Sequence, residues 1–131
     1  PAGVVAFAIA RRTRPRERPR SARQVRQDER SSLEALQALD VSTVSDRREA
    51  YARINALVRD HLRTVTGVEC GGLTPAEIAA AMRGHDGRVP LELATTVLAA
   101  CDQARYAPPD ALPPAAACRE AIDQATRVVG E

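Results

Sequence analysis

Apolar residues recur at spacings of three and four between residues 45 and 129, and this spacing favours helices over strands. The clearest stretch places Ile54, Leu57, Val58, Leu62 and Val65 on one side of a helix. Aromatic residues make up 2% of the chain and tryptophan is absent, so the core must consist of Ala, Leu, Val and Ile. Sheets depend more on β-branched and aromatic pairs. We therefore predict an all-α fold, a small bundle of four to five short helices.

Capping and breaking residues predict where these helices begin and end. Thr74, Pro75 and Glu77 form the strongest local signal, an N-cap, a first-turn proline and the third residue of a capping box. The predicted helices run from Ser31 to about residue 39, from Ser45 to Gly67, from Thr74 to Gly84, from Pro90 to Tyr106 and from Pro114 to Val129.

Charge divides the chain into a basic arm and a mildly acidic body. Residues 1–30 carry nine arginines against three acids, whereas residues 31–131 carry ten arginines against fourteen acids. Residues 3–10 are an uninterrupted apolar run, too short to cross a bilayer, which takes about 20 residues. We expect 1–10 to be the end of a truncated transmembrane helix, 11–30 an extended basic juxtamembrane linker, and 31–131 the helical domain.

Arginines directly after an apolar run fit the positive-inside rule. They predict a single-pass protein of the bacterial inner membrane, with the helical domain facing the cytoplasm. The expected contacts with the anionic membrane surface are Arg11, Arg12, Arg14, Arg16, Arg18 and Arg20. A solvated basic tail with an incidental apolar start is the alternative. Nucleic acid is a poorer partner for the arm, because no aromatic residue is interleaved for base stacking and the body is acidic.

Cysteine and histidine give little support to catalysis or metal binding. Cys101 and Cys118 lie on apolar stripes and are expected to be buried, whereas Cys70 beside two glycines is expected to be the most reactive thiol. His61 lies on an apolar stripe and is expected to be a core or boundary residue. The pair His85-Asp86 invites a metal or acid–base interpretation, but a polar turn fits better. We expect no enzyme, cofactor or metal.

The residues from about Ser45 to Val129 resemble the cytoplasmic C-terminal region of BatD-type aerotolerance proteins and the related MxaA-like membrane proteins of MoxR-associated operons. The resemblance is carried by residues 51–57, by Leu73-Thr74-Pro75-Ala76-Glu77-Ile78, and most specifically by residues 101–108, which end in Ala-Arg-Tyr-Ala-Pro. It implies a non-enzymatic accessory domain that works beside a MoxR-type AAA+ ATPase and von Willebrand factor A proteins. It supplies no catalytic residues.

A helix-turn-helix DNA-binding protein with a basic arm is the alternative function, since residues 73–79 resemble the opening of such motifs. Its second helix would be Pro90 to Tyr106, where Glu92, Thr95 and Asp102 make a poor surface for phosphates.

A protein-binding surface is expected around Arg105 and Tyr106. An arginine and an aromatic residue at a helix end, beside the rigid Pro108-Pro109 loop, are typical of interface anchors. An alternative that the sequence slightly favours is structural: Tyr106 packs on the core with its hydroxyl at the surface, and Arg105 pairs with a neighbouring acid.

Overall fold

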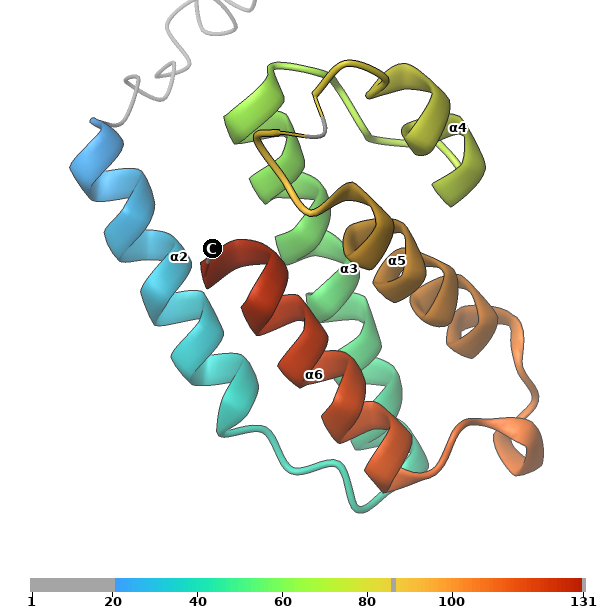
Figure 1. Cartoon of the computed structure of the whole chain (residues 1–131). Helices are drawn as coiled ribbons and strands as arrows, with labels where there is room; N and C mark the ends of the chain where they lie inside the picture. The colour runs from blue at the N-terminus through green and yellow to red at the C-terminus, as the bar shows by residue number, and fades with distance from the viewer. Residues whose placement is uncertain (1–20, 86, 131) are drawn as a thin grey trace, which may run out of the picture.

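The computed structural model describes residues 21–85 and 87–130, and all regular structure within them is helical (Figure 1). The helices are α2 (Ala22–Gln37), α3 (Val44–Thr66), α4 (Pro75–Ala81), α5 (Leu91–Tyr106) and α6 (Ala115–Gly130), with a short 3-10 helix η1 (Pro109–Ala111) before α6. The predicted all-α bundle is therefore confirmed.

Helix α3 is the centre of the bundle. Helices α5 and α6 pack against it and against each other, α2 lies along α3 and α6, and α4 packs on α5 (Figure 1). Ile54, Val58 and Leu62 of α3 have no exposed surface, and they meet Val97 and Leu98 of α5 in one continuous core. The core is mostly aliphatic, as the composition required, and Tyr51, Met82 and the three cysteines complete it.

The predicted helix ends are mostly correct. The side chain of Thr74 accepts a hydrogen bond from the Glu77 amide at 3.1 Å, and the Glu77 carboxylate accepts one from the Thr74 amide at 3.0 Å, which completes the capping box. Gly67 ends α3 with φ 76°, a left-handed conformation that glycine adopts without strain. Two boundaries shift slightly: α3 is capped by Thr43 rather than Ser45, and α4 ends at Ala81 before Gly84.

The start of the first helix was predicted wrongly. Helix α2 begins at Ala22, with the Ser21 side chain accepting a hydrogen bond from the Gln24 amide, so Ser31 lies inside the helix. Residues 22–30 are consequently helix and not extended linker, whereas 1–20, including the apolar run and Arg11 to Arg20, lie outside the described residues. These helical residues have little apolar periodicity, and the contact between Glu29 and His61 of α3 holds them on the body.

Arginine side chains bind backbone carbonyl groups where one element meets the next. Arg119 of α6 donates to the carbonyl oxygens of Gln37 and Leu39 at 3.1 and 2.6 Å, at the end of α2. Arg47 of α3 donates to the carbonyl oxygens of Val41 and Ser42 in the α2–α3 loop. The bond to Gln37 satisfies a carbonyl group that the end of α2 leaves without a partner, and the other bonds satisfy carbonyl groups of the α2–α3 loop.

Candidate interaction site

A groove runs between α3 and α5 and consists of two adjoining hollows of about 260 and 360 Å³. Asn55, Asp102 and Arg105 line both hollows and so form the boundary between them. Tyr51 and Ala104 give the smaller hollow an apolar floor. The loop between α3 and α4 lines one side of the larger hollow, and Tyr106 lies at its edge. We call this surface the α3–α5 groove.

The predicted pair of partner-binding residues lies at this groove. Tyr106 has 78% of its surface exposed and is the one large hydrophobic residue left exposed among the described residues. The Arg105 guanidinium lies 5.6 Å from the centre of the Tyr106 ring, within the range of a cation–π contact. The structural alternative is wrong for both residues, since the Tyr106 side chain is exposed and, among the described residues, Arg105 forms an ion pair with no acid.

Two further arginines, which the sequence did not single out, fix the walls of the groove. Arg48 of α3 donates to the carbonyl oxygens of Ala104 and Ala107 at 3.2 and 2.7 Å, so it holds the end of α5 that carries Tyr106. Because the Arg48 partners are neutral carbonyls, its positive charge is not cancelled there.

Arg59 fixes the other end of the groove. It donates to the carbonyl oxygens of Cys70 and Leu73, both at 2.7 Å, and to the side-chain oxygen of Asn55 at 2.8 Å. The spacing of four between Asn55 and Arg59 is visible in the sequence and indicates a contact on one helix face. The bonds to the α3–α4 loop are not visible there, since any residue supplies a carbonyl group.

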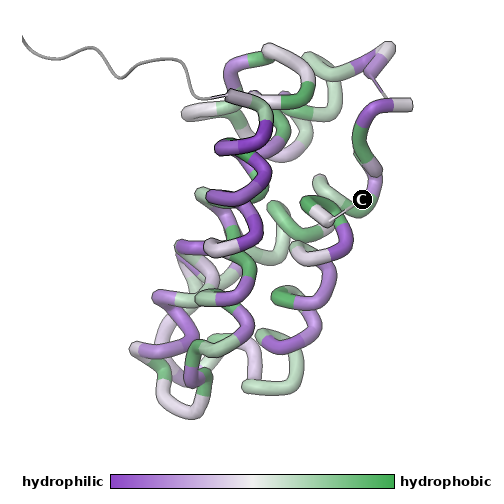
Figure 2. The backbone as a smooth tube through the Cα atoms, turned by 90° about the vertical axis from the view of Figure 1, so that its left-hand side faces the viewer, coloured by the Kyte–Doolittle hydropathy of each residue, from purple (hydrophilic) through white to green (hydrophobic). Residues whose placement is uncertain are grey.

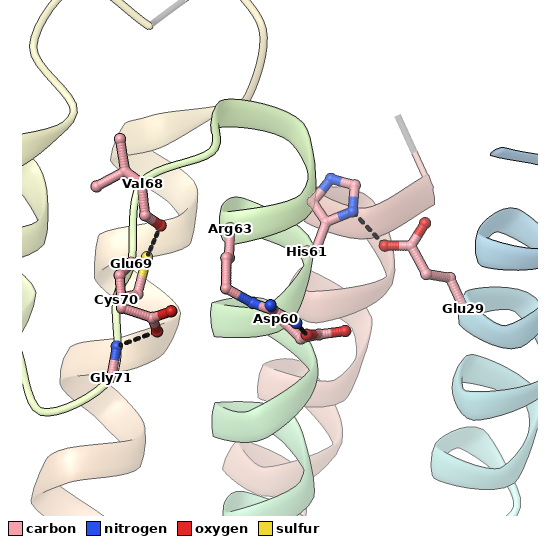
Figure 3. Close-up of polar contacts among 8 residues, drawn as sticks. All are labelled: Glu29, Asp60, His61, Arg63, Val68, Glu69, Cys70 and Gly71. Carbon is pink, nitrogen blue, oxygen red and sulfur yellow. Dashed lines mark hydrogen bonds and ion pairs between the residues drawn. The ribbon is translucent and has the colours of Figure 1, made fainter. Parts of the chain in front are cut away.

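The three cysteines are free and buried. Burial raises the pKa of the Cys101 thiol to about 12 and also raises the pKa of Cys118, as the sequence analysis expected for small buried hydrophobic residues. The expectation for Cys70 is wrong: it is 1% exposed, its Sγ lies 3.4 Å from the Val68 carbonyl oxygen, and burial raises its pKa (Figure 3). All three arrangements disfavour the reactive thiolate.

His61 is a buried boundary residue, as predicted. Its ring Nδ1 lies 2.5 Å from a carboxylate oxygen of Glu29, so the contact joins α3 to α2 (Figure 3). His85 is half-buried in the turn after α4, and Asp86 lies outside the described residues. In the described part of the chain, no group of three His, Cys, Asp or Glu side chains could hold a metal ion.

The geometry does not favour a helix-turn-helix. The segment between α4 and α5 is residues 82–90, longer than the turn of three or four residues in such motifs. Five residues of α5 are buried, and Glu92 is on its exposed side.

No helix among the described residues is both long enough and apolar enough to span a bilayer.

Comparison of the chain with models of protein families, with curated proteins and with solved structures finds no match. The groove is therefore interpreted from its own residues.

Proposed function

We propose that this chain is a non-enzymatic protein-interaction module that binds a segment of a partner protein in the α3–α5 groove. The observation that carries the proposal is Tyr106, a ring exposed over 78% of its surface and stacked with Arg105 at the edge of the groove. Tyrosine and arginine are enriched among the residues that dominate binding energy at protein interfaces. Neither side chain is part of the core, so both are available to a partner.

The charges of the groove indicate the chemistry of the partner segment. Arg48, Arg59 and Arg105 line it, against one carboxylate from Asp102. A partner segment with a carboxylate for Arg105 and an apolar side chain for the floor of the smaller hollow complements this surface. The bonds of Arg48 and Arg59 to backbone carbonyls hold the walls in place before binding, so less conformational entropy is lost when the partner arrives.

A binding role fits the residues better than catalysis does. The thiols are buried with raised pKa values, and His61 is in contact with Glu29 away from the groove. Nucleophilic catalysis by cysteine needs an accessible group that a neighbouring base or positive charge activates.

The partners that we propose are a MoxR-type AAA+ ATPase or a von Willebrand factor A protein, with this domain held at the cytoplasmic face of the membrane by its N-terminal segment. The sequence resemblance and the order of the apolar run and the arginines support this part of the proposal.

The test is a binding titration of the purified chain with a purified MoxR-type ATPase and, separately, with a von Willebrand factor A protein from the same operon. Replacing Tyr106→Ala should weaken binding by about 2 kcal/mol, roughly thirtyfold, and Arg105→Ala by a similar or smaller amount. Tyr106→Phe keeps the ring and should retain most of the affinity.

Arg83→Ala is the matched control, because Arg83 is exposed in the segment after α4, away from the groove. Binding that responds to Arg83 as much as to Arg105 would show that overall charge, not the groove, sets the affinity. Tight binding unchanged by Tyr106→Ala would contradict the proposed site, and no binding to either protein would contradict the proposed partners.

A further inference from the structure

Helix α2 carries a row of arginines on its exposed side. Arg23, Arg26 and Arg30 are exposed and follow the spacing i, i+3, i+7, which puts them on one face over about 10 Å of helix. In the part of the chain that the structure describes, none of their guanidinium groups forms a hydrogen bond or an ion pair. We call these three residues the α2 arginine row.

The side of α2 that packs on the body is separate from this row. Leu36 is the buried residue of the helix, and Glu29 reaches His61 of α3. Figure 2 looks onto α2 and shows mostly hydrophilic residues along the visible side of the helix. Within the described residues these three guanidinium groups hold no two elements together, whereas those of Arg48 and Arg119 bind backbone carbonyls of another element.

We propose that the α2 arginine row lies against an anionic lipid surface and so orients the domain on the membrane. The proposal rests on the membrane attachment proposed above, and it adds a second contact, made by the folded domain itself. In the sequence, α2 follows the apolar run by little more than the ten residues from Arg11 to Arg20. A fully extended segment of that length spans at most about 35 Å, so the row stays within reach of the surface.

Charge complementarity favours lipid over nucleic acid as the occupant. The row and the preceding residues are strongly basic, whereas residues 31–131 carry a net charge of −4, so an anionic plane would attract one side of the domain and repel the rest. Residues 11–40 contain no aromatic residue on which an unpaired base could stack. Glu34, one turn beyond Arg30, is an acid on this side of α2 and limits the row to its first three turns.

The test is the binding of the full 131-residue chain to vesicles of phosphatidylcholine alone and of phosphatidylcholine with phosphatidylserine. The variant Arg23→Gln/Arg26→Gln/Arg30→Gln should raise the dissociation constant for the anionic vesicles by at least about tenfold at low salt, since each arginine near an anionic leaflet strengthens binding by roughly fivefold before screening. Helicity should not change, because the three side chains are exposed.

The matched control is Arg83→Gln/Arg88→Gln/Arg127→Gln. These three arginines are exposed too, lie outside α2, and form no hydrogen bond or ion pair within the described residues, so both triple variants take the formal net charge from +2 to −1. Equal weakening by the two variants would overturn the proposal in favour of net charge alone. No weakening by the α2 variant would overturn it as well.

A third variant separates this inference from the proposed membrane attachment. Replacing the six arginines of residues 11–20 by glutamine tests the arm. If that variant no longer binds anionic vesicles and the α2 variant binds them fully, the proposed role of the arginine row is overturned. The proposed attachment through the arm would then remain. Stronger binding of the wild-type chain to duplex DNA than to the anionic vesicles, lost in the α2 variant, would assign the row to nucleic acid instead.

Discussion

Helices α2 and α6 have the same length and are attached in different ways. Each has 16 residues, but six residues of α6 are buried and only Leu36 of α2 is. Helix α2 is held at polar points: Glu29 to His61 of α3, the Gln37 side chain to Thr126 of α6, and the carbonyls at its end to Arg119. The comparison shows that two segments can be equally helical and still differ in how strongly they are attached to the rest of the domain. We expect α6 to open with the whole domain and α2 to open alone.

The largest effect is expected for Ile122→Ala in α6. Ile122 is 1% exposed, and removing a buried isoleucine side chain costs about 2–5 kcal/mol, a large part of the stability of a domain of this size. Urea denaturation measures the change in the free energy of unfolding. Leu36→Ala in α2 is the comparison. If α2 opens alone, the loss in the free energy of unfolding on Leu36→Ala cannot exceed the free energy of that local opening, so it should be smaller than the loss on Ile122→Ala. Equal losses would show that the two helices unfold together.

Alkaline pH should destabilise the core that α6 shares with α3 and α5, and it should not act on the attachment of α2. Burial raises the pKa of Cys101 and of Tyr51 to about 12 and raises that of Cys118, and these groups lie on α5, α3 and α6. A raised pKa means that the folded state holds the proton more tightly. The stability from this effect is therefore complete below the unfolded pKa values of 9.0 and 10.0 and is lost as pH rises toward 12.

The measurement is the free energy of unfolding from pH 8 to 12, and a flat profile across this interval would contradict the burial of these groups. The loss should be about 1.4 kcal/mol per pH unit for each group that titrates. Cys101→Ala should reduce the slope. Helix α2 carries none of these groups, so Glu29→Ala should leave the slope unchanged.

Breaking the contact between Glu29 and His61 should release α2. The two side chains are 16% and 10% exposed, and Glu29→Ala leaves the buried imidazole without this partner, at a cost of about 1–3 kcal/mol. Hydrogen exchange should speed up in α2 and stay unchanged in α5 and α6. Glu49→Ala is the control, because it breaks an exposed pair with Arg53 that is worth about 0–1 kcal/mol. Faster exchange in α6 as well would mean that α2 and α6 open as one unit.

The smallest effects are expected at two helix caps. The side chains of Ser21 and Thr43 accept hydrogen bonds from the amides of Gln24 and Asp46 at the starts of α2 and α3, and replacing either by alanine removes about 1 kcal/mol of helix stability. The full loss caused by Thr43→Ala should be measured in the free energy of global unfolding. Ser21→Ala should lower the free energy of global unfolding by no more than the free energy of the local opening of α2, and it should speed hydrogen exchange in α2 alone. Faster exchange in α6 as well as in α2 on Ser21→Ala would remove the distinction between the helices.

Local patterns predicted the fold wherever local interactions decide it. Thr74, Pro75 and Glu77 place the start of α4, and Gly67 ends α3, because capping and left-handed backbone depend on neighbouring residues. The start of α2 was predicted wrongly because its first residues include few apolar residues at helical spacing. Glu29 lies 32 positions from His61, and no periodic pattern records a contact over that separation.

The candidate site shows the same division. Arg105 and Tyr106 stood out as a cation and an aromatic residue at a helix end, and both lie at the groove. The groove itself depends on Arg48, which binds carbonyls 56 and 59 positions away. Cys70 was expected to be accessible beside its glycines, but the Arg59 guanidinium binds its carbonyl oxygen and its side chain belongs to the buried core.

The arginine–carbonyl bonds have a consequence for how this domain can change in evolution. Arg47, Arg48, Arg59 and Arg119 each join separate segments through a backbone oxygen, which every amino acid provides. Substitution of the residue that carries the carbonyl leaves the bond intact, so no compensating change at the arginine is required. Divergent descendants can thus keep these contacts while their sequences record no covarying pair for them.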